Sequence, residues 1–182
     1  MVRRWAAAFV LGTPLACSPV LDWREVRLEG LQAMLPCKPD HGERTVQLGK
    51  LEVRLQMSGC EASGALYAIS HVRVKGADQA MAAQAAWRSA ALANMQARTV
   101  QSRPIKLGRP SAANAAPARE QSLQAGSALE LLSAQGTQPD GKPVQARLVW
   151  IAAGDHLYHV AVYGPQLDNE RLETLFTDLR LQ

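Results

Sequence analysis

The amino-terminal segment constrains this chain most, because it decides which residues fold and in which compartment they do so. Arg3 and Arg4 precede a continuously apolar run, residues 5–11, and small residues follow before Cys17. A positive start, a short apolar stretch and a small-residue end are typical of a secretory signal. The apolar run is far shorter than the roughly 20 residues that a membrane-spanning helix needs. We therefore expect residues 1–16 to be a signal peptide that is removed on export.

The residues around Cys17 suggest what happens after export. Ala16 directly precedes Cys17, and this pair resembles the lipobox of bacterial lipoproteins, although Pro14 stands where that motif usually has leucine. The resemblance implies that Cys17 is acylated and that residues 17–25 tether the domain to a membrane surface. Ser18 in the next position implies the outer membrane, on the periplasmic side of the bacterial cell envelope. Ordinary signal cleavage without a lipid is the alternative.

Two cysteines remain once Cys17 is assigned to lipid. Cys37 and Cys60 each end an expected strand, 23 positions apart, with a hairpin between them. In an oxidising compartment, two thiols that come close usually form a disulfide. A redox-active or metal-binding pair is the alternative, but there is no Cys-x-x-Cys and two cysteines alone make a poor zinc site. We expect a Cys37–Cys60 disulfide.

Hydropathy patterning predicts a mostly antiparallel sheet with two main helices, an α+β domain over residues 26–182. Glycine-centred turns predict hairpins, and alanine-rich or amphipathic stretches predict helices. Asp78 and Asp168 are expected to cap the two helices, and Met81 and Trp87 to lie on the packed side of the first. The expected elements are hairpins 44–48/51–55 and 146–153/156–163, strands 66–74, 99–107, 118–124 and 127–134, and helices 78–97 and 169–179.

The order of these elements resembles the Mog1/PsbP-like fold, a class of small α/β/α sandwiches. The segments that carry the resemblance are the proline-closed strand 33–39, strand 66–70 leading into a helix, strands 147–151 and 157–162, and the closing residues 175–179. The chain is also similar to uncharacterised lipoproteins of proteobacteria. The resemblance implies a protein-binding module without catalytic machinery. It carries over no functional residue.

The sequence contains few patterns typical of a catalytic, metal-binding or cofactor-binding site. His156 and His159 lie three apart on an expected strand, which places them on opposite faces and prevents joint metal binding. No nucleophile elbow, phosphate loop, dinucleotide-binding motif or calcium loop occurs. Net charge is +4, of which two arginines belong to the signal, so we expect no nucleic-acid partner. We expect no catalytic residue, no metal and no cofactor.

One basic stretch leaves a question open. Arg98, Arg103, Lys106 and Arg109 lie close together in the sequence without an aromatic residue between them. A solvated strand edge is the simplest interpretation, because charges there discourage pairing with other molecules. Contact with a polyanion or a lipid headgroup is the alternative.

Together these patterns predict a lipoprotein whose domain binds an unidentified envelope protein at the membrane surface. A periplasmic carrier of a small hydrophobic ligand is the first alternative, with a pocket between the sheet and the long helix near Trp87. A hydrolase of unrecognised type is the second.

Overall fold

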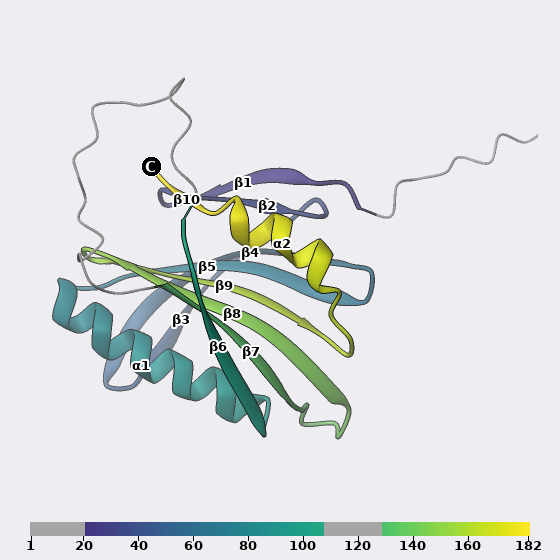
Figure 1. Ribbon diagram of the computed structural model, residues 1–182. Coiled ribbons are helices and arrows are strands. Elements are labelled where there is room, and N and C mark those ends of the chain that lie inside the picture. The colour runs from purple at the N-terminus through teal and green to yellow at the C-terminus, as the bar shows by residue number, and fades with distance from the viewer. Residues whose placement is uncertain (1–20, 108–128) are drawn as a thin grey trace, which may run out of the picture.

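The architecture is a large antiparallel sheet covered on each face by other elements (Figure 1). The computed structural model describes residues 21–107 and 129–182. Within these residues, seven strands form one sheet and three form another, and the strands pair in antiparallel fashion throughout both sheets. In order across the large sheet the strands are β3 (Asp40–Leu48), β4 (Leu51–Ala62), β5 (Ala65–Arg73), β9 (His156–Gly164), β8 (Pro143–Ala153), β7 (Leu129–Thr137) and β6 (Thr99–Ile105).

The small sheet and two helices complete the described structure. The small sheet has the order β1 (Arg24–Leu28), β2 (Leu31–Leu35) and β10 (Arg180–Leu181), and the helices are α1 (Ala77–Asn94) and α2 (Asn169–Thr177). Helix α1 lies along one face of the large sheet, and α2 and the small sheet lie on the other (Figure 1). The predicted α+β class, with a mostly antiparallel sheet and two helices, is confirmed.

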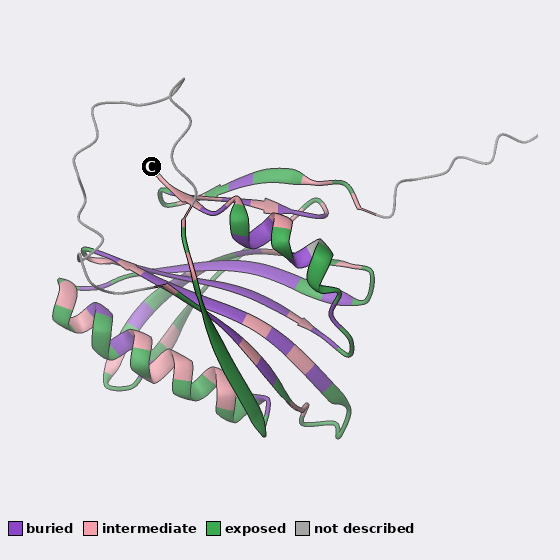
Figure 2. Ribbon diagram, viewed as in Figure 1, coloured by how far each residue is buried: buried purple, intermediate pink, exposed green. Residues whose placement is uncertain are grey.

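The central strands are buried on both faces because apolar residues occupy most positions in their sequences. On β9, Val160 and Val162 belong to the core beneath α2 and the small sheet, and Leu157 and Ala161 belong to the core beneath α1. Figure 2 shows buried residues concentrated on β5, β8 and β9 and exposed residues along β6. The edge position of β6 agrees with Pro104, which cannot donate to a strand ladder.

Both predicted hairpins form, with turns at Gly49 and Gly154 in the left-handed region (φ 63° and 62°). The first hairpin is longer than the alternation predicts, since β4 continues to Ala62. Its second half pairs with β5, from Leu55 opposite Val72 to Ala62 opposite Ala65. Pairing with β5 therefore extends β4 beyond the residues in which apolar and polar side chains alternate.

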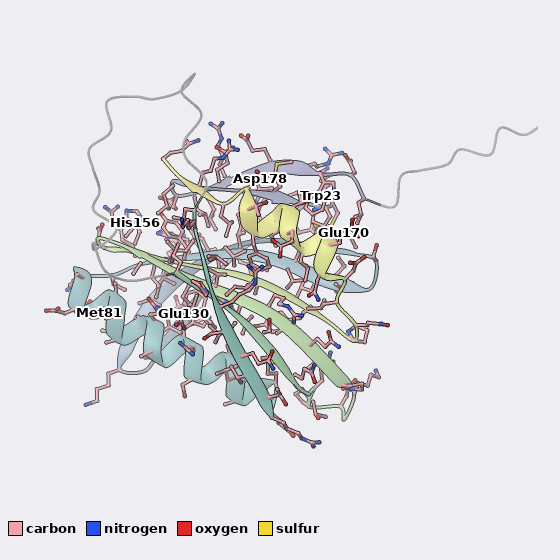
Figure 3. All side chains as sticks on the ribbon, in the orientation of Figure 1. Trp23, Met81, Glu130, His156, Glu170 and Asp178 are labelled. Carbon is pink, nitrogen blue, oxygen red and sulfur yellow. A yellow bond between two sulfur atoms is a disulfide. The ribbon has the colours of Figure 1, made fainter. Side chains whose placement is uncertain are left out.

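Helix α1 corrects two expectations. Gly76, with φ 89°, occupies the N-cap without a side-chain cap hydrogen bond, and Asp78 lies inside the first turn. Met81 does not face the core, because 51% of it is exposed on the outer side of α1 (Figure 3). The helix contacts the sheet through Ala80 and Ala83, both fully buried. Small side chains let the helix approach the sheet closely, whereas hydrophobicity alone favours the larger Met81 for the buried side.

Helix α2 follows its sequence signals more closely. The Asp168 side chain accepts a hydrogen bond from the Glu170 backbone N–H at 3.0 Å, which confirms the predicted cap. The helix ends at Thr177, two residues earlier than predicted. The chain then continues into β10, which pairs with β2.

A disulfide joins Cys37 to Cys60, as predicted, with the two Cα atoms 6.0 Å apart. It links the segment after β2 to β4, and so connects the small sheet to the large one. Closing a loop of 23 residues stabilises the folded state by about 3 kcal/mol in the chain-entropy account.

Several expectations fall on residues outside those described: the signal peptide, Cys17, most of the tether and the predicted strand 118–124. Among the helices of the described chain, none has the length and apolar character needed to cross a membrane.

Gly136 on β7 supports a prediction about packing. The Met95 carbonyl oxygen at the end of α1 accepts a hydrogen bond from the Thr137 backbone N–H at 2.7 Å, and a Cβ at Gly136 would overlap that oxygen. We expect Gly136→Ala to lower the free energy of unfolding by at least about 2 kcal/mol, because the backbone at Met95 or at position 136 would have to move. Gly42→Ala is the matched control, since a Cβ there meets nothing within 4 Å. Urea denaturation would contradict this packing if both variants matched the wild type.

Candidate ligand-binding groove

A groove opens between α2 and the part of the large sheet formed by β6, β7 and β8. The small sheet contacts β4 and β5, so it leaves this end of the same face uncovered. The groove has a volume of about 400 Å³, within the range of small-molecule sites. It is lined by Thr99, Gln101, Arg103, Leu131, Ser133, Gln135, Arg147, Asn169, Leu172, Glu173 and Phe176.

The strand register builds a polar floor. Gln101 on β6 pairs with Ser133 on β7, which pairs with Arg147 on β8, so the three side chains form one row across the sheet. The next residue along the row is Val162 on β9, which is fully buried. The same face therefore changes from apolar at its covered centre to polar beside the open edge.

Arg147 is the most distinctive side chain of the floor. Its Nη2 donates to the Asn169 side-chain oxygen at 2.8 Å, and its Nη1 donates to the Ala146 carbonyl at 3.1 Å. No carboxylate forms an ion pair with it among the described residues. Burial, and secondarily the charge of Arg103, lowers the pKa of Arg147. The fold thus holds a half-buried cation without a countercharge of its own.

Arg103 differs because it has an acidic partner. Its Nη2 lies 2.6 Å from Glu173 Oε1 on α2, so this ion pair spans from the edge strand to the helix. A second pocket, of about 460 Å³, is also lined by Arg103 and Glu173, together with Lys106 and Phe176. The predicted basic stretch therefore lies partly on the groove, although Arg109 is outside the described residues.

Trp87, proposed from the sequence as a pocket residue, lies on the opposite face of the sheet. It is half-buried on α1, and its ring centroid is 5.0 Å from that of His159, which stacks on Trp150 at 4.5 Å. Neither of the two pockets is lined by Trp87. The structure shows it as a packing residue between α1 and the sheet.

The histidines lie where strand alternation predicts. His159 faces α1, whereas His156 faces the other side of the sheet and its Nδ1 lies 2.8 Å from His71 Nε2. His71 also contacts Gln56, at 3.2 Å. Within the part of the chain that the structure describes, no three His, Cys, Asp or Glu side chains converge on a possible metal site.

Sequence reasoning missed two features. His41 Nδ1 lies 2.7 Å from Ser58 Oγ, and counting outward from the Gly49 turn would have placed the two opposite each other. Ser58 is only 1% exposed and lines neither of these two pockets. Arg147 was missed because it interrupts an apolar hairpin, and only the position of α2 shows that it borders a groove.

Two buried histidines predict how stability depends on pH. Burial lowers the pKa of His159 to about 3, and burial followed by the charge of His156 lowers the pKa of His71 to about 4. Both bind protons more readily in the unfolded chain, with its ordinary pKa near 6.5, so the folded state loses stability as the pH falls through that value. Lowering the pH from 8 to 5 should reduce the free energy of unfolding by about 2 kcal/mol for each of the two histidines.

Urea denaturation at the two pH values tests this expectation. His159→Phe should reduce the loss between pH 8 and pH 5 by about 2 kcal/mol, because it removes one of the two groups. Trp87→Phe is the control, since it changes packing against the same ring without removing a titratable group. An unchanged loss in His159→Phe would contradict the assignment.

Comparison with known proteins assigns no family to this chain. No protein-family model and no curated protein matches the sequence.

Proposed function

We propose that this chain is an exported lipoprotein that acts as a non-catalytic binding module in the cell envelope, with the groove beside α2 as its binding site. One observation carries the proposal. A polar groove of about 400 Å³ contains the half-buried guanidinium of Arg147, which has no acidic partner among the described residues. Burial of a cation without a countercharge is costly, and a ligand that supplies one offsets that cost.

The disulfide supports export. Cys37 and Cys60 are bonded in the structure, and disulfides form and persist in oxidising compartments such as the periplasm. This agrees with a secretory signal over residues 1–16 and leaves Cys17 for acylation. An acylated Cys17 would hold the domain at the outer membrane, facing the periplasm.

The lining of the groove supports binding rather than catalysis. Its side chains include amides, a serine hydroxyl and arginines, which orient a ligand by hydrogen bonds and charge. Its one acid, Glu173, is already paired with Arg103. The polar floor favours a polar partner over the hydrophobic ligand of the carrier alternative.

The layer order supports the Mog1/PsbP-like sandwich as the fold. Helix α1 contacts β8 and β9 from one side, and α2 contacts β2 of the small sheet on the other. Proteins of this class are generally protein-binding modules, so we propose that the partner is another protein of the envelope.

Acylation can be measured directly. The full-length chain, expressed in a Gram-negative host, should fractionate with membranes, and its intact mass should show acyl chains on Cys17. Cys17→Ser should remove the acyl mass, whereas Ser18→Ala should keep it. Recovery of the wild-type chain as an unacylated soluble protein would contradict the anchor.

A site-specific photo-crosslinker tests the groove as the binding site in the native envelope. Placed at Gln101, on the groove floor, it should yield a discrete crosslinked protein of one mass. Placed at Met81, which is 51% exposed on α1 and far from the groove face, it should not. The same products from both positions, or none from Gln101, would contradict the proposed site.

A further inference from the structure

We propose that the groove recognises a carboxylate group of its ligand, and that Arg147 is the residue that binds it. This inference rests on the proposed function, because it names the chemistry that the same groove would take.

Arg147 has N–H groups that make no hydrogen bond to the described residues, and their planar arrangement suits a planar acceptor. A guanidinium has five N–H groups, and among the described residues Arg147 engages only the Asn169 side-chain oxygen and the Ala146 carbonyl. Those two contacts fix the orientation of the guanidinium and leave three N–H groups for another acceptor. A carboxylate matches the planar fork of arginine by accepting two parallel hydrogen bonds.

The neighbours of Arg147 add neutral hydrogen-bonding groups. Ser133 and Gln101 lie in the same cross-strand row, and neither side chain hydrogen-bonds to another described residue. The amide of Gln101 and the hydroxyl of Ser133 both donate and accept hydrogen bonds. They can therefore contact the polar atoms that adjoin the carboxylate of a ligand.

The charge balance favours a singly charged anionic group. Glu173 neutralises Arg103, so Arg147 supplies the net positive charge of the groove. A cationic ligand would meet two arginines. A phosphate group would bring close to two negative charges to one unpaired cation, whereas each carboxylate group of a ligand brings one. A carboxylate matches that single charge, and its approach would reverse the penalty that burial imposes on the Arg147 cation.

The experiment measures binding of glutarate to the purified mature protein by NMR, following the Arg147 Nε–H signal and the backbone amides of Gln101 and Ser133. At constant ionic strength, glutarate should shift these signals saturably, and the neutral glutaramide should not. Arg147→Gln should raise the Kd for glutarate at least tenfold. Arg73→Gln is the matched control, because Arg73 is an exposed arginine paired with Asp155, outside the groove.

If Arg147→Gln folds poorly, the comparison of glutarate with glutaramide on the wild-type protein still tests the inference. If glutarate and glutaramide act alike on the wild-type signals, or if Arg73→Gln loses binding as much as Arg147→Gln, the carboxylate inference is overturned. The shift by glutarate and its absence with glutaramide support it.

A peptide arm separates the sources of the carboxylate. A blocked peptide with glutamate at alternate positions should compete with glutarate, whereas its glutamine counterpart should not, if the ligand is a segment of a partner protein. Binding of glutarate without competition by the peptide supports the carboxylate inference and contradicts a protein partner. Crosslinking at Gln101 with no response to glutarate or to the peptide overturns the carboxylate inference alone, so the two proposals fail separately.

Discussion

Burial of the central strands on both faces is the constraint on which the rest of this structure depends. β5, β9 and β8 are buried at most positions, on both faces, so each face of the large sheet needs a cover. Helix α1 covers one face, and α2 with the small sheet covers the other. The Cys37–Cys60 disulfide connects the small sheet to the large sheet, and so holds part of that cover in place.

The groove exists because α2 and the small sheet together do not cover the full width of the large sheet. Beyond β9 the α2 side of the sheet becomes polar, and the row from Val162 through Arg147 and Ser133 to Gln101 passes from core to solvent. Arg147 lies at this boundary, where it is partly desolvated but still accessible from the groove. An unpaired cation at such a boundary costs free energy, and an anionic ligand bound there would offset that cost.

Much of the fold could be predicted from local signals. The Gly49 and Gly154 turns and the Asp168 cap are determined by residues close in sequence. The Cys37–Cys60 pair was predictable because both cysteines lie beside expected strands with a hairpin between them. The failures arose where tertiary packing chooses between similar residues. In α1 the sheet accepts the small Ala80 and Ala83 and leaves Met81 in solvent, although methionine is the more hydrophobic side chain.

The candidate site was much less predictable than the fold. The sequence by itself determined that side chains alternate between the two faces along each of β6, β7 and β8. Pairing between these strands then set the register that places Gln101, Ser133 and Arg147 in one row. Only the tertiary structure decided that this face borders a groove, since that depends on where α2 packs and how far the small sheet extends. Trp87 was a plausible pocket residue by composition, but packing set it against His159 on the other side of the sheet. Alternation is a local property of the chain, whereas an uncovered surface depends on the placement of distant elements.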